Sequence, residues 1–398
     1  MDDRDDSLAV LDRGVALINR LLGLALPRPT RDASPAADDG TPTAAAVEAR
    51  YAALMVAMLG SPDAATVDRE GASMASFVPP SLSDDEIAGC VRRLGEMDDR
   101  RLVETAFETV SIRPIGLDEV FRPGGYVYGK INHGYWERIT LRGLDRMGEP
   151  YVRPINRLID PKSMFDEFLV LTLAAQMRRR RAPPGCFMTD ACSLGLGFNN
   201  GNRASTPESY PEPLTPPVRA AMTGCLAFLE TQFQARRFQV SDGAFPKQLI
   251  FDGTITAFAE RIVAASDAVV VVGPPHLART RLRGFQGTTY AISVPPWSIH
   301  PMWPAVLGYV LGRLSDIAGR HARVTVLVQA AAASAPLASL VDLMRADLED
   351  CEIHFIDMGQ ALDVATLTEV PVGRWVRQPK VTAATAGRTM PLYLEKEP

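Results

Sequence analysis

Three apolar runs in the C-terminal third of the sequence constrain the fold more than any other feature. They cover residues 267–272, 324–328 and 353–356, and each is continuous rather than alternating. Continuous runs are typical of parallel strands that helices cover on both faces. Each run ends in glycine or polar residues, and ligands of open α/β sheets bind outside the carboxyl ends of the strands. We therefore expect a mostly parallel sheet with a ligand site along that edge.

Helical patterns dominate the N-terminal part. Apolar residues recur at helical spacing between residues 8 and 26, and another helix is expected to begin after Ser83, with Glu86 in the capping-box position. The polar face of the first helix is not rich in Lys or Arg. We therefore interpret this helix as docking on its own domain or on a dimer partner rather than on a membrane surface.

The predicted fold class is α/β: a mostly parallel sheet flanked by helices, with an N-terminal helical extension. For a chain of 398 residues, one large domain with extensions is a natural expectation. We predict a mainly helical region over 1–118 with a linker near 27–44, an α/β domain over 119–370 and a tail over 371–398. Residues 186–217 are expected to form a long polar loop, a kind of segment that often serves as a lid.

Composition excludes several classes of protein. The 42 basic and 47 acidic residues give a net charge of −5, which argues against a dedicated nucleic-acid binder. Five scattered cysteines suggest a reduced, intracellular chain. The acidic start differs from a signal peptide, and no apolar run approaches the ~20 residues of a membrane span. We expect a cytoplasmic protein, and a homo-oligomer is compatible with the sequence.

A polar turn follows a short aromatic run at residues 126–128. The residues of interest there are Lys130, Asn132, His133, Gly134 and Glu137. A glycine at a strand-to-helix turn lets a backbone approach a ligand, and the free amides of a helix start favour an anion. Glu137 could act as a base or a metal ligand. The same pattern also fits a plain tight turn with a Glu in the first helical turn.

A second polar stretch covers residues 241–247. Its Asp-Gly pair predicts a turn at Asp242, and Lys247 lies a few residues further on. A lysine near a strand end could neutralise a diphosphate, although a solvated surface lysine fits equally well.

The ends of the apolar runs supply the other candidates. Gly273 and His276 follow the first run, and His276 could bind a phosphate, act as a base, or donate to a backbone carbonyl. Asp357 and Gln360 follow the last run. Asp363, close behind, could help bind a divalent cation or cap a helix. No GxGxxG, Walker A, HExxH or GxSxG motif is present.

The order and spacing of these pieces resemble the GT-D class of bacterial glycosyltransferases. The resemblance covers roughly residues 125–365 and is best after residue 265. It implies a Rossmann-like fold, a nucleotide-sugar donor and an acidic turn that handles the donor and a Mn or Mg ion. Aligned on Gly134, the two acidic positions of that turn hold His133 and Tyr135 here. Glu137 is the nearest acid, so the sequence indicates a divergent member.

The working hypothesis is a nucleotide-sugar-dependent glycosyltransferase with an unknown acceptor, which could be a glycan, a protein or another molecule. Glu137 or His133 would be the catalytic base or orienting group, and Lys247 would offset charge on the leaving diphosphate. Lys130, Asn132, Gly134, Asp242, Gly273, His276, Asp357 and Gln360 would line the donor site. Glu137 and Asp363 are the metal candidates. Two alternatives stay open: another nucleotide or nucleoside group transfer, and a catalytically degenerate scaffold that binds a partner.

Overall fold

The computed structural model divides into two compact units, and each is described by itself. The first contains residues 1–71, 116–129 and 245–398, and the second contains 72–115 and 130–244. The longer stretches that the structure describes are residues 3–22, 84–113, 115–129, 253–274, 284–294, 303–330, 333–345 and 350–359. Shorter described pieces lie between 188 and 282, at 347–348, at 361–362 and at 394–396.

The first unit is built on a five-stranded sheet whose described pairs are all parallel. Its strand order is β2-β9-β8-β5-β7. The strands are β2 (Tyr126–Tyr128), β5 (Ala268–Gly273), β7 (Thr288–Ser293), β8 (Arg323–Val328) and β9 (Glu352–Asp357). The six residues of β5 are all buried, as expected of a central strand covered on both faces. This sheet confirms the predicted α/β class with a mostly parallel sheet.

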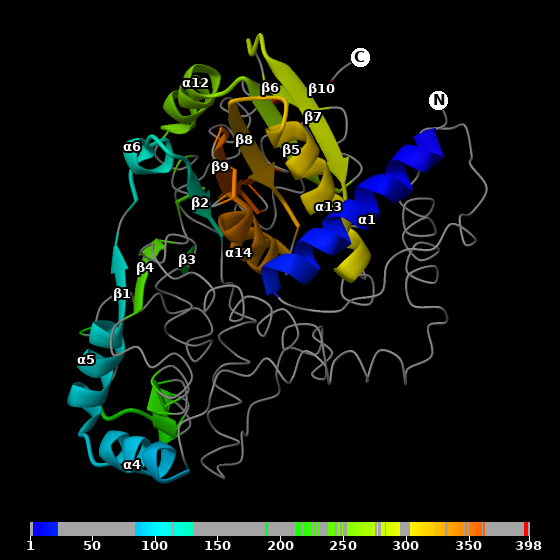
Figure 1. Ribbon diagram of the computed structural model, residues 1–398. Coiled ribbons are helices and arrows are strands. Elements are labelled where there is room, and N and C mark those ends of the chain that lie inside the picture. The colour runs from blue at the N-terminus through cyan, green and yellow to red at the C-terminus, as the bar shows by residue number, and fades with distance from the viewer. Residues whose placement is uncertain are drawn as a thin grey trace. The chain divides into compact units, whose positions relative to one another are not determined.

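Three helices connect or precede these strands. They are α12 (Ile255–Ala265), α13 (Trp303–Ala318) and α14 (Ser334–Arg345). The β7–α13–β8 and β8–α14–β9 connections run in the same direction across the sheet. Right-handed crossovers therefore place α13 and α14 on the same face, and Figure 1 shows both helices in front of the strands. Because α14 follows β8, its N-terminus lies toward the carboxyl edge of the sheet.

The N-terminal helix α1 (Asp3–Leu22) packs against α13, as Figure 1 shows. Its buried apolar residues include Leu11, Val15 and Ile18, three positions of the predicted stripe. The two backbones approach closely, because a Cβ built on Gly14 would lie only 1.6 Å from the Gly308 carbonyl oxygen. The helix therefore docks on its own unit, one of the two alternatives that the sequence left open.

A short antiparallel pair joins the end of the sequence to the connection between β5 and β7. Strand β6 (Thr280–Leu282) pairs with β10 (Leu394–Lys396), with Glu395 opposite Arg281. Part of the predicted tail is thus a strand.

A buried histidine, His354, makes hydrogen bonds at the β2 edge of the sheet. Helix α6 (Leu117–Val120) precedes β2, and the His354 ring lies 2.8 Å from the Val120 carbonyl oxygen and 3.0 Å from the Glu352 carboxylate. Burial lowers the pKa of His354. The ring also packs against Phe121. His354 therefore has a structural role in joining β9 to α6.

The second unit contains helices and a small parallel sheet. Its described elements are α4 (Asp84–Gly95), α5 (Asp99–Thr109), β1 (Val110–Arg113), β3 (Met188–Thr189) and β4 (Phe238–Asp242). The strand order is β1-β4-β3, and both pairs are parallel. Residues 110–113 form a strand inside the region predicted to be mainly helical, and residues 188–189 form one inside the predicted loop.

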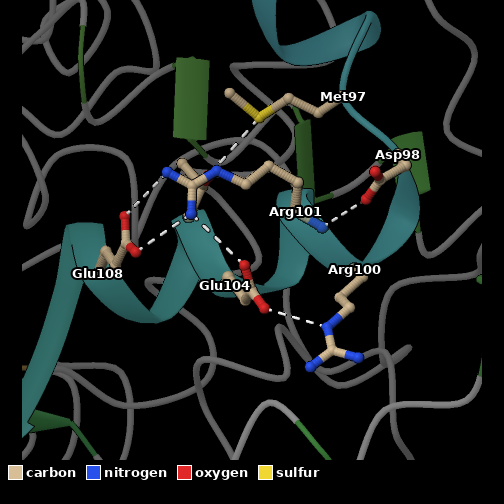
Figure 2. A network of polar contacts seen from close by, with 7 residues as sticks. Met97, Asp98, Arg100, Arg101, Glu104 and Glu108 are labelled. Carbon is tan, nitrogen blue, oxygen red and sulfur yellow. Dashed lines mark hydrogen bonds and ion pairs between the residues drawn. The ribbon is translucent and has the colours of Figure 1, made fainter.

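Charged side chains stabilise α5, as Figure 2 shows. Asp98 caps the helix by accepting a hydrogen bond from the Arg101 backbone amide at 2.7 Å. Arg101 also pairs with Glu104 and Glu108 along the exposed side of the helix. Exposed ion pairs of this kind each contribute little to stability.

No helix among the described residues is long and apolar enough to cross a membrane. The predicted helix that begins after Ser83 is confirmed as α4, which starts at Asp84. The predicted domain boundaries at 118–119 and 370–371 stay predictions.

Candidate functional site

The strand order of the five-stranded sheet reverses between β5 and β8. From β5 the chain proceeds to β7 on one side, whereas from β8 it proceeds to β9 on the other side. A reversal of this kind is a topological switch point, where open α/β sheets bind their ligands at the carboxyl ends of the strands. The candidate site is therefore the carboxyl edge formed by the ends of β5, β8 and β9.

Gly273 ends β5 close to Leu277 and Gln329. A Cβ on Gly273 would lie 2.5 Å from the Leu277 Cδ1 atom and 3.5 Å from the Gln329 carbonyl oxygen. The Leu277 amide donates to the Pro274 carbonyl oxygen at 2.9 Å. A larger residue at Gly273 would therefore require the tip of the Leu277 side chain to shift.

The end of β8 leads directly into α14. The Gln329 amide continues the sheet by donating to the Val272 carbonyl oxygen at 2.8 Å. Next, the Ala330 amide donates to the buried Ser334 hydroxyl at 3.2 Å. Ser334 is the first residue of α14, so this bond fixes the start of the helix at the carboxyl edge. The first amides of a helix favour a bound anion such as a phosphate.

The end of β9 carries a buried carboxylate. Asp357 is 4% exposed, and its Oδ1 atom accepts a hydrogen bond from the Gly359 amide at 3.0 Å. Gly359 has a positive φ of 51°, which favours glycine in this turn. Asp357 is the register partner of Val328, which in turn is the partner of Val272. With strands about 5 Å apart, Asp357 and Gly273 are separated by about 10 Å across the sheet.

The opposite, amino edge of the sheet is occupied by an ion pair. Arg323 donates to Asp267 at 2.6 Å, and this hydrogen bond holds the pKa of the Asp267 carboxyl below its usual range. Nearby, the Tyr290 hydroxyl lies 2.9 Å from the His321 Nε2 atom. Because Arg323 pairs with Asp267 and Tyr290 pairs with His321, we assign these four residues a structural role.

Neither described free cysteine has the properties of a nucleophile. Burial raises the pKa of Cys90 and of Cys351 to about 11, so both thiols stay protonated at neutral pH. No cluster of three or more metal-ligating side chains occurs among the residues that the structure describes. Asp357 is the carboxylate that the described part of the candidate site offers.

Of the predicted site residues, Gly273 and Asp357 lie at the same edge of one sheet. Asp242 ends β4 in the other unit, where it is the register partner of Thr189. The other candidates fall outside the described residues: Lys130, Asn132, His133, Gly134, Glu137, Lys247, His276, Gln360 and Asp363. Their predicted roles stay predictions.

Two residues of this edge were not singled out from the sequence. Gln329 is the first polar residue after β8, and Ser334 fixes the start of α14. The polar residue that ends the apolar run could have indicated Gln329. Ser334 follows a run of alanines, and its bond to Ala330 depends on a helix start that periodicity does not locate to the residue.

Comparisons with known proteins give little further information. No family model matches the sequence, and no curated protein matches it. The chain is similar to a solved structure described as the selenomethionine-substituted structure of domain of unknown function 1792. The TM-score is 0.36 at 10% identity, covering 73% of this chain and 93% of that chain. A similarity of this size carries no argument about function.

Proposed function

We propose that the chain is a glycosyltransferase that uses a nucleotide-sugar donor, with the donor bound at the carboxyl edge of β5, β8 and β9. The observation that carries the proposal is the switch point between β5 and β8, which has Gly273 on one side and the buried Asp357 on the other. Open α/β sheets bind nucleotides at such points. The sequence motifs resemble those of the GT-D class, and this resemblance favours a nucleotide-sugar over other nucleotides as the ligand.

Two described groups of this edge suit parts of such a donor. The N-terminus of α14 favours the negative charge of a diphosphate. Asp357 is a carboxylate at the end of β9, and carboxylate oxygens are acceptors for the hydroxyls of a ribose or a sugar.

The transfer itself requires groups beyond those of the described edge. An acceptor hydroxyl would attack the anomeric carbon of the donor, forming a new C–O bond as the bond to the diphosphate breaks. In our proposal Glu137 or His133 takes the hydroxyl proton, and Lys247 offsets the charge on the departing nucleoside diphosphate. A Mn or Mg ion, held with the help of Glu137 or Asp363, would serve the same purpose on the phosphates.

The direct test is thermal unfolding in the presence of UDP-, GDP- and dTDP-sugars, with and without manganese. A ligand present at about 100 times its dissociation constant stabilises the folded state by about 2.7 kcal/mol. We expect one of these donors to raise the melting temperature of the wild-type protein. Asp357→Asn should abolish most of that rise, because it removes the charge yet keeps an oxygen that can accept from Gly359.

Asp350→Asn is the matched control, since Asp350 is an exposed residue before the amino end of β9. It should leave the ligand-induced rise unchanged. If no nucleotide-sugar shifts the melting temperature at any metal concentration, the proposal is wrong and a partner-binding scaffold becomes the better account. A rise with free nucleotides but no turnover of sugar donors would instead favour another nucleotide group transfer.

A further inference from the structure

Strand β7 forms one edge of the five-stranded sheet. Within the described part of the chain it pairs with β5 alone, and Figure 1 shows it at the margin of the five strands. The Thr288 amide donates to the Asp267 carbonyl oxygen at 3.2 Å, and the Val294 amide donates to the Gly273 carbonyl oxygen at 2.8 Å. These two bonds fix which residues of β7 direct their backbone groups toward β5.

The outer side of β7 carries backbone groups that are available to another strand. Successive residues of a strand direct their backbone groups to opposite sides, so Thr289 and Ala291 face away from β5. Among the described residues, neither of them makes a backbone hydrogen bond on that outer side. Ala291 is also exposed to solvent. Such an edge is a template on which a further strand can pair.

The sequence of β7 lacks the features that normally protect an edge strand. Native edge strands are protected by charged residues, by proline, by bulges or by being very short. Strand β7 has six residues, Thr-Thr-Tyr-Ala-Ile-Ser, with no charged residue and no proline. Threonine, tyrosine and isoleucine are among the residues that favour strands. The strand is therefore suited to pairing along its outer side.

We infer that β7 pairs in antiparallel orientation with β7 of a second copy of this chain, so that the two sheets join into one. A two-fold axis at Tyr290 places Thr289 of each copy opposite Ala291 of the other. These are the residues whose backbone groups face outward, and each facing pair exchanges both of its N–H···O bonds. Because the strand carries no charge, no like charges face each other along it. A two-fold contact of this kind is the commonest arrangement of homo-oligomers.

Tyr290, on the axis, favours a second copy over an unrelated strand as the partner. Its hydroxyl lies 2.9 Å from the His321 Nε2 atom, and the Arg320 Cζ atom lies 5.7 Å from the centre of its ring. These contacts hold the ring in place before pairing. Aromatic side chains at directly facing positions stabilise a pair of strands. The two Tyr290 rings face each other in this way only if the partner strand is β7 itself.

Sedimentation velocity on the full chain over a range of concentrations tests the inference. We expect the wild type to form a dimer that dissociates on dilution. Ala291→Pro should raise the dimer dissociation constant at least about tenfold, because it removes an outward amide that makes no bond within one copy. Ala291→Lys, which keeps the amide but places a charge on the edge, should also weaken the dimer. Circular dichroism checks that both variants fold.

Val263→Lys is the matched control, since Val263 is an exposed residue of α12. It should leave the dissociation constant unchanged. Disulfide cross-linking then tests the register, because the Cα atoms at position 290 of the two copies would be about 4.5 Å apart, within the range of a disulfide. Under mild oxidation Tyr290→Cys should form a covalent dimer and Val263→Cys should not.

A wild-type chain that is monomeric at every concentration would overturn the inference and would leave this edge to an extended peptide of another protein. So would folded Ala291→Pro and Ala291→Lys variants that dimerise like the wild type, or equal cross-linking of Tyr290→Cys and Val263→Cys. The inference does not depend on sugar transfer. Nucleotide-sugars that fail to bind would leave these results unaffected.

Discussion

Asp99 organises the described part of the second unit through several contacts at once. Its carboxylate accepts a hydrogen bond from the Leu214 amide at 2.8 Å and pairs with Arg219. Arg219 also donates to the Gly95 carbonyl oxygen at 3.0 Å, close to the end of α4. The bond to Gly95 satisfies a carbonyl oxygen at the end of α4, where the last carbonyl groups have no partner within the helix. Asp99 thereby ties the α4–α5 turn to the segment that begins near residue 214.

We predict that Asp99→Ala lowers the free energy of unfolding by about 1–3 kcal/mol, because it leaves Leu214 and Arg219 without this partner. Urea unfolding followed by circular dichroism measures the change. Arg101→Ala, which removes exposed ion pairs, should lower the free energy of unfolding by much less. Equal losses in the two variants would contradict the role given to Asp99.

The same residue predicts a dependence on pH. The Leu214 amide, followed by Arg219, holds the pKa of the Asp99 carboxyl below its usual value. Its stabilising contribution is therefore present above the unfolded pKa of about 3.9 and is lost as the pH falls through the lower folded pKa. Asp99→Asn should reduce the acid dependence of unfolding in that range.

At the scale of elements, α1 and α13 depend on glycines for their close approach. Besides Gly14, a Cβ on Gly312 would lie 2.2 Å from the Val10 carbonyl oxygen. We predict that Gly14→Ala destabilises the protein by about 1–3 kcal/mol or displaces α1, because the two backbones must separate. Gly319→Ala is the control, since its nearest contact would be 3.6 Å. Urea unfolding compares the two, and an unchanged Gly14→Ala variant would show that α1 does not dock this way.

Elements differed in how well the sequence predicted them. The three apolar runs became β5, β8 and β9, and the amphipathic stripe became α1, because length and periodicity are strong local signals. Strands β1, β3 and β10 were missed. Each has four residues or fewer and is defined by pairing with a segment far away in sequence. Short runs carry no periodicity of their own, so a strand that depends on long-range pairing cannot be read from them.

At the candidate site, the sequence could predict those residues that directly follow an apolar strand. Gly273 and Asp357 follow such runs directly, so their meeting at one edge followed from the parallel topology. The sequence did not predict which strands would be neighbours in the sheet. The order β2-β9-β8-β5-β7 places the switch point between β5 and β8, and this order depends on long-range packing.

At the scale of the whole molecule, the chain passes repeatedly between its two units. Residues 116–129 contribute α6 and β2 to the first unit, although the segments on both sides of them belong to the second. Segments far apart in sequence therefore build each unit, and β2 completes its edge of the sheet only by pairing with β9. The described residues of the donor site that we propose lie within the first unit.

The most direct test of the central claim is to map where a nucleotide-sugar binds. The donor that gives the largest thermal shift would be used as its photoreactive azido derivative, and the labelled peptides would be identified by mass spectrometry. We predict labelling at the ends of β5, β8 and β9, around residues 273–277, 329–334 and 357–359. Labelling confined to the amino edge of the sheet, around Asp267 and Arg323, or to the second unit would contradict the account.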